Sequence, residues 1–435
     1  MSPSQPSRIL LKGGRLVCPH TDLDQVGDLL IDRGVIADLG GDLSGKAVNG
    51  VQVVDCKGLY VAPGLIDLHV HLREPGQEYK ETIASGGGAA AAGGFTAVCC
   101  MPNTSPVNDS RAVTEMILER ARQKGSCRVY PVGAITQGLK GEHLSQMAEL
   151  QEAGCVAVSD DGRPVANSQV LRRAMEYAAG FGLPVICHSE ELSLSAGGAM
   201  HEGPTATRLG LRGIPAEAES IAVERDLALA RLTGAWVHIA HVSTAASVAA
   251  VRRAKEAGAR VSCETAPHYL ALIDENVGEY DTNFKMNPPL RSAADREAVR
   301  RGLADGTIDA VATDHAPHSI LEKMVEFDKA AFGVIGLETC LGVMLKLVDD
   351  GLLNLPQVLK RLTAGPAKAL KLPGGRLQEG GPADVVVIDA KRPWRVEPEA
   401  FRSLSRNTPF AGWQLPGRAV LTLCGGRVTH RLEGF

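Results

Sequence analysis

The feature that most constrains the fold is a regular alternation of short apolar runs and helix-like stretches between Pro63 and Leu372. Strands that alternate with helices form parallel β-α-β units, and eight such units close into a (β/α)8 TIM barrel. The predicted fold class is therefore α/β. Eight apolar runs are typical of buried strands: 65–71, 95–101, 128–133, 155–159, 184–188, 236–241, 260–264 and 308–314. The predicted helices include 110–123, 169–180, 216–233 and 244–257.

The two ends of the chain have a different texture, with short strands and glycine turns and no helical period. The N-terminal strands are expected at 9–11, 15–17, 28–31, 35–37 and 51–54, and the C-terminal ones at 384–389, 419–423 and 427–429. Two separate β segments with exposed edges would be poorly stable. Residues 1–62 and 373–435 are therefore predicted to form one composite β-sandwich domain beside the barrel, which takes residues 63–372.

Composition excludes several classes of protein. The net charge of −4 does not indicate binding to nucleic acid or to an anionic membrane surface. Residues 1–14 contain no apolar run of signal-peptide length, and no stretch approaches the roughly 18 apolar residues of a membrane span. The ten cysteines are scattered without a Cys-x-x-Cys pair. Reduced thiols in a cytoplasmic protein are the interpretation that fits this pattern.

Metal-type side chains fall at the predicted strand ends. His69 and His71 are two residues apart on the first strand, so both imidazoles point to one face. In a TIM barrel the carboxyl ends of the strands meet at one rim. Nitrogen and oxygen ligands without a thiolate suit one or two zinc ions or a similar divalent metal. The candidate ligands at these strand ends are His69, His71, the pair Asp160 and Asp161, His188, His241 and Asp314.

Other polar residues near these strand ends have different expected roles. One aspartate of the pair Asp160 and Asp161 should face the metals and the other should face away. His238 lies three residues before His241, so it should face the opposite side of the strand and pack. Asp67 is not expected to bind a metal directly; it could orient a metal ligand or simply pack. His268 follows the seventh strand, where a site role and a packing role are equally favoured. The remaining histidines considered, His20, His143, His201 and His430, are expected at surface or structural positions.

Five motifs then occur in the order typical of one family. They are residues 67–76 (DLHVHLREPG), 101–104 (MPNT), 159–162 (SDDG), 285–291 (KMNPPLR) and 312–318 (ATDHAPH). With them the chain resembles the dihydroorotase family, in its large bacterial type, within the amidohydrolase superfamily. The resemblance covers nearly the whole chain.

The resemblance implies a metal-ligand set. His69, His71 and Asp314 would hold one zinc, and His188 and His241 the second. Many relatives bridge the two metals with a carboxylated lysine after the fourth strand, but residues 155–164 contain no lysine. In the large bacterial dihydroorotases an aspartate takes that place, and Asp161 matches it. The family often has two histidines after the seventh strand, and here Tyr269 replaces the second.

The resemblance also implies a substrate site. Arg73 would clamp a substrate carboxylate, since a guanidinium binds a carboxylate in bidentate fashion. The segment 319–331 would form a mobile lid, with a plain surface loop as the alternative. For Asn103 and Asn287 a turn-forming role is the alternative to ring binding. The full set of implied substrate contacts is His71, Arg73, Asn103, Asn287, His318, Phe332 and Gly333.

The implied function is a zinc-dependent dihydroorotase. It would interconvert dihydroorotate and N-carbamoyl-L-aspartate in de novo pyrimidine (UMP) biosynthesis, with Asp314 as the catalytic residue that moves the proton. The resemblance further implies a homo-oligomer, in the simplest case a dimer, and an association with aspartate transcarbamoylase. The alternatives are a dihydropyrimidinase (hydantoinase) or allantoinase, and a non-catalytic relative that serves as a scaffold. The strand-four aspartate and Arg73 favour dihydroorotase.

Overall fold

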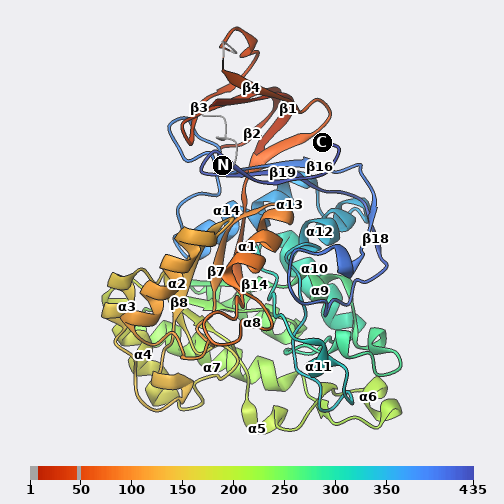
Figure 1. Cartoon of the computed structure of the whole chain (residues 1–435). Coiled ribbons are helices and arrows are strands. Elements are labelled where there is room, and N and C mark those ends of the chain that lie inside the picture. Colours follow the sequence, from red (N-terminus) through yellow and green to blue (C-terminus); the bar gives the residue numbers. More distant parts are fainter. Residues whose placement is uncertain (1–7, 47–49) are drawn as a thin grey trace.

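The computed structural model describes residues 8–46 and 50–435, and its central element is a barrel of eight parallel strands (Figure 1). Neighbouring strands pair in chain order, and a parallel bridge between Val70 and His315 joins the last strand region to the first. All eight predicted strands are confirmed. The barrel strands are β6 (Leu65–Val70), β7 (Phe95–Cys100), β8 (Arg128–Gly133), β9 (Ala157–Ser159), β10 (Val185–Cys187), β13 (Val237–Ile239), β14 (Val261–Thr265) and β15 (Ala310–Val311).

Helices cover the outside of the barrel (Figure 1). Several of them begin with a side-chain cap: Asn167 accepts hydrogen bonds from the amides of Gln169 and Val170, and Thr244 accepts one from the amide of Ser247. The covering helices are α1 (Ile83–Ala92), α2 (Arg111–Lys124), α3 (Met147–Ala153), α4 (Ser168–Gly180), α7 (Glu217–Thr233), α8 (Ala245–Glu256), α10 (Ala293–Asp305), α12 (Cys340–Asp349), α13 (Leu355–Leu362) and α14 (Ala364–Ala369). The predicted helices correspond to α2, α4, α7 and α8.

Short elements occupy the loops between the barrel units. They are the helices α5 (Leu192–Ser195), α6 (Pro204–Leu209), α9 (Pro267–Ala271) and α11 (Ile320–Lys323), and the strand pair β11 (Met200–His201) with β12 (Gly213–Ile214). A further strand pair, β17 (Trp394–Arg395) with β18 (Gln414–Leu415), lies between β16 and β19 in the C-terminal segment. Within the described parts of the chain, no helix combines the length and the apolar character that a membrane crossing requires.

The barrel strands are buried on both faces, as their near-continuous apolar runs predict. Ile66 and Leu68 of β6 belong to a cluster of mostly small side chains, with Ala97, Ala157 and Ala310 from other strands. Leu65 and Val70 belong instead to the large cluster that includes helix residues. Leu65 faces away from Ile66 and Leu68, as the two-residue period of a strand predicts, whereas Val70 departs from that period after an irregularity in the pairing of β6 with β7 between Asp67 and Val70. All ten cysteines are free thiols, and all but Cys424 are buried.

Strands from both ends of the chain form a second eight-stranded sheet. Its order is β20-β19-β16-β5-β1-β2-β3, with β4 paired to β1, and Val385 of β16 lies opposite Pro63 of β5. Its own apolar cluster combines residues such as Leu11 and Leu29 with Val387 and Leu421. The strands are β1 (Arg8–Cys18), β2 (Leu23–Asp32), β3 (Val35–Gly40), β4 (Val51–Asp55), β5 (Tyr60–Pro63), β16 (Val385–Asp389), β19 (Arg418–Cys424) and β20 (Arg427–Arg431).

One detail of this sheet corrects the prediction. Residues 9–11 and 15–17 are not two strands but parts of the single strand β1, with a shift of register between Leu11 and Gly14. A bulge in which Gly13 has φ of +69° absorbs the one extra residue of β1, so the glycine pair bends the strand without ending it. Residues 1–7 and 47–49 of the predicted segment 1–62 lie outside the described residues. The division into units at 62/63 and 372/373 stays a prediction.

Part of the C-terminal segment contacts the barrel. We call residues 396–415 the C-terminal strap. Glu81, before α1, accepts hydrogen bonds from the Ser403 hydroxyl and from the amide of Leu404. Glu338, before α12, accepts the amides of Arg402 and Ser403 at 2.8 and 3.2 Å. Two carboxylates that precede barrel helices therefore fix the strap.

Glu338 makes stability depend on pH. Burial raises the pKa of its carboxyl from 4.5 to about 7. Between these values the folded chain keeps a proton that the unfolded chain has lost, so the free energy of unfolding falls as pH rises. Because glutamine does not ionise, Glu338→Gln should gain about 1–3 kcal/mol relative to the wild type between about pH 5 and pH 8. Urea unfolding at both pH values measures the difference, with Glu256→Gln as the exposed control. A stability difference that does not change with pH would contradict this expectation.

Candidate active site

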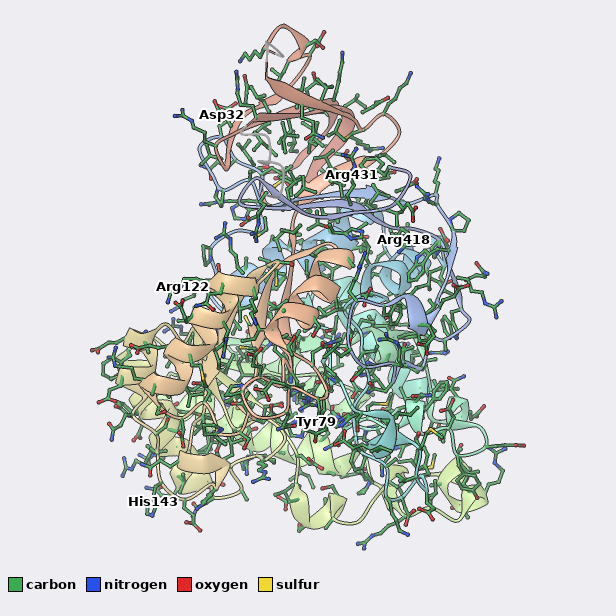
Figure 2. The ribbon with its side chains drawn as sticks, in the orientation of Figure 1. Asp32, Tyr79, Arg122, His143, Arg418 and Arg431 are labelled. Carbon is green, nitrogen blue, oxygen red and sulfur yellow. The ribbon has the colours of Figure 1, made fainter. Side chains whose placement is uncertain are left out.

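The candidate ligands lie at the carboxyl ends of five barrel strands. His69 belongs to β6, and the others follow the ends of β6, β9, β10, β13 and β15 within three residues. All six side chains are buried. His241 and Asp314 have positive φ angles of 34° and 48°, a conformation that costs a residue with a Cβ about 1–3 kcal/mol and that is concentrated at functional sites. This end of the barrel is far from the second sheet: Tyr79, in the loop after β6, lies at the opposite end of the molecule from Asp32 and Arg431 (Figure 2).

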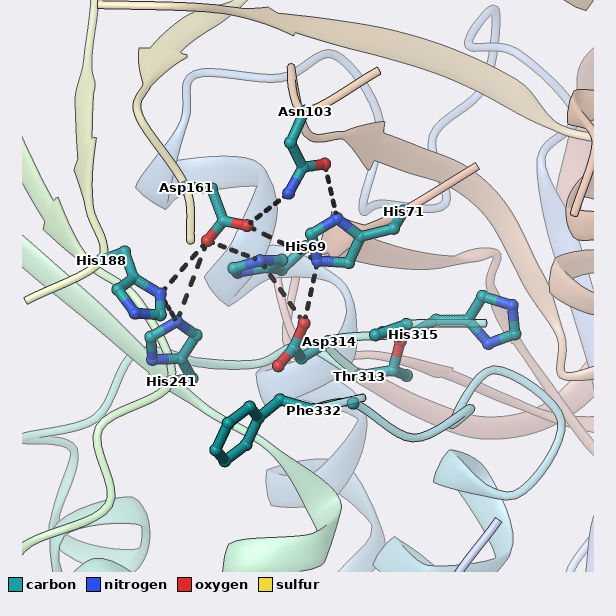
Figure 3. A network of polar contacts seen from close by, with 12 residues as sticks. His69, His71, Asn103, Asp161, His188, His241, Thr313, Asp314, His315 and Phe332 are labelled. Carbon is teal, nitrogen blue, oxygen red and sulfur yellow. Dashed lines mark hydrogen bonds and ion pairs between the residues drawn. The ribbon is translucent and has the colours of Figure 1, made fainter. Parts of the chain in front are cut away.

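Asp161 is the centre of the arrangement (Figure 3). Its Oδ1 lies 3.2 Å from His69 Nε2 and 3.5 Å from His188 Nδ1, and its Oδ2 lies 3.6 Å from His71 Nε2. His241 Nε2 is 4.0 Å from Oδ1. Two groups that could hold a metal ion therefore share this carboxylate: His69, His71 and Asp161, and Asp161, His188 and His241. A bridging role for Asp161 requires this placement, and the role itself stays a prediction.

Asp314 faces the first of these groups. Its Oδ1 lies 3.1 Å from His71 Nε2 and 3.6 Å from His69 Nε2. Burial opposes ionisation of Asp314, but His69 and His71 outweigh it and lower the pKa of the carboxyl. The same balance lowers the pKa of Asp161 well below its ordinary value, with His69 as the main neighbour. Both carboxylates are thus anionic at neutral pH.

Polar partners hold the far nitrogens of three rings. His69 Nδ1 lies 3.2 Å from Glu264 Oε1, His71 Nδ1 lies 2.9 Å from Asn103 Oδ1, and His188 Nε2 lies 3.0 Å from Glu190 Oε2. Partners of this kind fix the orientation of a metal-binding histidine and direct its other nitrogen at the metal. Here the other nitrogens all face Asp161.

The donor set fits a divalent metal. His69 Nε2 is buried and has no hydrogen-bond partner among the described residues, although it faces two carboxylates. Burial and the neighbouring rings of His188 and His69 lower the pKa of His241 to about 3, so this imidazole is neutral. Burial disfavours the charged form of His188, but Asp161 and Glu190 outweigh burial and raise the pKa of His188 to about 10. The site therefore favours a positive charge. A cation held by neutral imidazoles and carboxylates would supply that charge.

A second group surrounds Arg73. Its Nε donates to the Pro317 carbonyl at 3.1 Å, and one of its terminal nitrogens lies 3.5 Å from His318 Nε2. His318 Nε2 also lies 2.8 Å from the Phe332 carbonyl. Burial and the cations Arg73 and Lys323 lower the pKa of His318 to about 3, so His318 is neutral. A Cβ on Gly333 would come within 3.1 Å of the same ring nitrogen.

The two asparagines are tied to the histidine cluster. Asn103 uses its amide oxygen on His71 and donates from Nδ2 to Asp161 at 3.3 Å. Asn287 Nδ2 donates to Glu190 at 3.0 Å, and Glu190 in turn contacts His188. Every predicted site residue is thus joined either to the histidine cluster or to the Arg73 group.

The residues expected to face away do so. Asp160 accepts the amides of Ile135 and Thr136, and Asp67 accepts the amides of His69 and Thr313. His315, next to Asp314, points out of the cluster (Figure 3) and lies 3.2 Å from Glu81.

The seventh-strand corner holds His268 and Tyr269, whose rings are 4.2 Å apart. The Tyr269 hydroxyl donates to the Pro288 carbonyl. His268 is buried, and its Nε2 has no hydrogen-bond partner within residues 8–46 and 50–435. Burial lowers its pKa to about 4, so the ring is neutral. His268 belongs to neither of the two groups that could hold a metal ion.

Sequence reasoning missed three supporting residues. Glu264 ends up beside His69, and Glu190 holds both His188 and Asn287. His-Ser-Glu spacing after β10 could have indicated Glu190. Asn407, in the C-terminal strap, donates to the carbonyls of Ala316 and Gly333 and accepts the amide of His318. Nothing in the sequence near Asn407 indicates that role.

Glu264 also extends a row of polar contacts along the barrel. Its Oε2 lies 3.2 Å from His238 Nε2, and His238 Nδ1 lies 2.8 Å from the Ser262 hydroxyl. Burial opposes ionisation of Glu264, but His238 and His69 outweigh burial and lower the pKa of Glu264 to about 2. His238 therefore packs away from the metal ligands, as expected, but it contacts the residue that orients one of them.

The predicted lid, residues 319–331, is anchored by two lysines. Lys323 donates to the carbonyls of Thr282, Lys285 and Ala331, and Lys285 donates to those of Phe327 and Asp328. In contrast, Ile320, Leu321 and Met324 are exposed. Motion of this segment stays a prediction.

Comparisons with known proteins agree with this geometry. A family model described as "Dihydro-orotase-like" matches residues 58–247, and one described as "Amidohydrolase family" matches residues 219–430. A protein named Dihydroorotase from Desulforapulum autotrophicum is 57% identical over 98% of this chain and 99% of its own length. One of the same name from Geobacter metallireducens is 53% identical over 97% and 99%.

Solved structures share the whole architecture. An L-hydantoinase (dihydropyrimidinase) from Arthrobacter aurescens superposes with a TM-score of 0.88 at 26% identity, covering 97% of this chain and 96% of that one. A dihydropyrimidinase from Brevibacillus agri gives a TM-score of 0.85 at 25% identity, with 98% and 96% covered.

Fold and site together define the class, an amidohydrolase: a barrel hydrolase, generally metal-dependent, with histidine and aspartate clusters at the strand ends. The sequence identity of 57% and 53% to the two proteins named Dihydroorotase, over nearly the full length of the chain, identifies the family within this class. The chain belongs to the dihydroorotase family.

The shared position of Asp161 generates a prediction about metal. Asp161→Ala removes the one carboxylate common to both groups, so metal affinity should fall by more than about 100-fold, the upper end of what losing an outer-shell partner costs. Metal analysis of purified protein after dialysis measures this. The matched control is Asp160→Asn, since Asp160 faces away and that variant should retain metal. Equal metal content in both variants would contradict the central role of Asp161.

Proposed function

We propose that this chain is a zinc-dependent dihydroorotase, which reversibly hydrolyses dihydroorotate to N-carbamoyl-L-aspartate. The observation that carries the proposal is the carboxylate of Asp161, shared by two histidine pairs, together with a buried arginine, Arg73, two residues after His71. A hydrolase acting on a cyclic amide needs a metal-type site, and a substrate with a free carboxylate needs a cation beside it. Relatives named Dihydroorotase at 53–57% identity support the same substrate.

The proposed ligands are His69, His71, Asp161, His188, His241 and Asp314. When bound, zinc would supply Lewis acidity and would lower the pKa of water toward about 7. Glu264, Asn103 and Glu190 orient three of the imidazoles toward the proposed metal site. Asp161 and Asp314 stay ionised and balance the charge.

Asp314 is the proposed proton carrier. In hydrolysis it takes a proton from the attacking water and delivers it to the ring nitrogen that leaves. In ring closure it accepts a proton from the carbamoyl nitrogen of N-carbamoyl-L-aspartate. Its carboxylate faces His71 and His69 and carries a low pKa, so it is ready to accept a proton.

The proposed substrate contacts divide by chemistry. Arg73 binds the substrate carboxylate, with His318 beside it, and Phe332 and Gly333 present backbone groups to the ring. Asn287 Nδ2 donates a hydrogen bond to Glu190. The Oδ1 atom of Asn287 has no donor among the described residues, so this oxygen can accept a hydrogen bond from a ring N–H. Asn103 and His71 border the ring from the metal side.

The alternatives differ in the need for Arg73. The two hydantoinase structures support a dihydropyrimidinase reading at the level of fold, and an allantoinase would use the same barrel. Neither dihydrouracil nor allantoin carries the free carboxylate that a buried guanidinium would bind. A non-catalytic scaffold is disfavoured because the full set of candidate ligands converges.

The proposal extends to the setting of the enzyme. It places the chain in de novo pyrimidine (UMP) biosynthesis in the cytoplasm, with two zinc ions, as a homodimer that can associate with aspartate transcarbamoylase. These parts rest on the family resemblance, and size-exclusion chromatography with both proteins tests the assembly.

Ring opening of dihydroorotate tests the function. Turnover should disappear with a chelator and return with added zinc, and Asp314→Asn should lower kcat by about 10²–10⁴-fold because the proton carrier is lost. Absorbance at the dihydroorotate band follows the reaction, and thermal melting checks the fold. Asp349→Asn, at the exposed end of α12, is the control. Near-normal turnover of Asp314→Asn would refute the assignment.

Arg73 tests the substrate. Arg73→Gln should lower kcat/KM for dihydroorotate by about 100-fold or more, the effect of leaving a buried charge without its partner. Any turnover of dihydrouracil should change far less, because that ring has no carboxylate. Arg122→Gln, on the outside of α2 (Figure 2), is the matched control. Parallel losses on both substrates would argue against the clamp.

A further inference from the structure

A large cavity lies at the other end of the barrel from the candidate active site. Its volume is about 1170 Å³, at the upper end of ordinary ligand pockets of roughly 300–1,000 Å³. Trp236, Arg260 and Asp309 line it, and each immediately precedes a barrel strand, β13, β14 or β15. Helices α13 and α14 and the turn between β1 and β2 complete its walls. None of the residues assigned above to metal or substrate lines this cavity.

The lining is strongly basic, although the whole chain carries a net charge of −4. Six lysine or arginine side chains line the cavity, against two aspartates. Both aspartates already have partners: Asp309 lies 2.5 Å from Lys255 Nζ, and Asp305 lies 2.6 Å from Arg252. The acids therefore do not neutralise the remaining cations.

Arg361 has no carboxylate partner but donates to the Leu303 carbonyl. Four further basic side chains have neither a carboxylate partner nor a hydrogen bond within the described residues. These are Arg260, Lys360, Lys368 and Arg376, and no acidic oxygen of the described ranges 8–46 and 50–435 lies within 4.0 Å of their charged nitrogens. These four side chains are exposed, so solvent screens their mutual repulsion, but together they make this wall electropositive and would attract an anion.

The walls are held in place by other contacts. Arg361 donates twice to the Leu303 carbonyl, and Lys255 also donates to the Thr307 carbonyl. A Cβ on Gly365 would come within 2.2 Å of the Asp309 carbonyl, so α14 approaches the start of β15 as closely as a glycine allows. A site whose walls are already ordered loses little conformational entropy on binding.

An aromatic ring stands beside the cations. Arg260 lies 5.2 Å and Lys371 lies 4.5 Å from the centre of the Trp236 ring. Such contacts orient the guanidinium and ammonium groups. They also place a flat apolar surface next to the charged part of the cavity.

We propose that this cavity binds a small molecule with a di- or triphosphate group. Guanidinium forks match phosphate oxygens in bidentate fashion, and lysines add point charges. Four unpaired cations suit a group with three or four negative charges better than a single carboxylate. The cavity also has room for an organic part attached to the phosphates, next to Trp236.

Calorimetric titration of the full-length holoenzyme with inorganic tripolyphosphate and with ATP tests the proposal. Both should bind saturably with a Kd below about 1 mM, and rising salt should weaken binding. ATP binding much tighter than tripolyphosphate would identify a nucleotide-like ligand, and equal affinity would identify the polyphosphate group itself as the ligand. Either result supports the proposal.

Paired variants decide where the anions bind. The double variant Lys360→Ala/Lys368→Ala should weaken binding at least about tenfold, since two of the four unpaired cations are lost. Lys57→Ala/Lys391→Ala removes two exposed lysines outside the cavity and should change affinity less than about twofold. Polyphosphates also chelate metals, but metal loss would affect both variants equally. Absence of saturable binding, or equal weakening in both variants, would overturn the proposal.

Discussion

The burial of Asp161 among four imidazoles is the interaction on which the rest of the site depends. A carboxylate out of contact with water is costly unless charge or hydrogen bonds compensate it. Here the compensation comes from rings on β6, β10 and β13, so the strands have to close into a barrel before the charge is balanced. The site therefore couples the closure of the fold to the chemistry at its rim.

The barrel and the ligand set were predictable from sequence because both leave local signals. Apolar runs mark the strands, and each polar ligand follows such a run directly, so the parallel arrangement brings the ligands together. The two-residue period also separated His69 and His71 from their neighbours. The bulge in β1 was missed because Gly13 and Gly14 are equally typical of a turn, and only pairing with β2 shows that the strand continues.

The supporting residues were less predictable, for physical reasons. Glu264 reads as one more polar residue at a strand end, and its contact with His69 depends on side-chain geometry across the barrel. Asn407 is separated by 89 residues from His318, which it holds. The C-terminal strap could contact any loop near its path, and the local sequence does not indicate which loop it contacts. Glu81 and Glu338, which fix the strap, were missed for the same reason.

The contacts from Ser262 through His238 and Glu264 to His69 have a consequence for anyone who alters this protein. Ser262 lines the basic cavity, whereas His69 faces the metal ligands. Replacing the buried Ser262 at the cavity end of the barrel would thus remove a hydrogen-bond partner of His238, which contacts the glutamate that orients His69. Polar contacts thus connect the two ends of the barrel, and a change at the cavity end can alter the orientation of a candidate metal ligand at the other end.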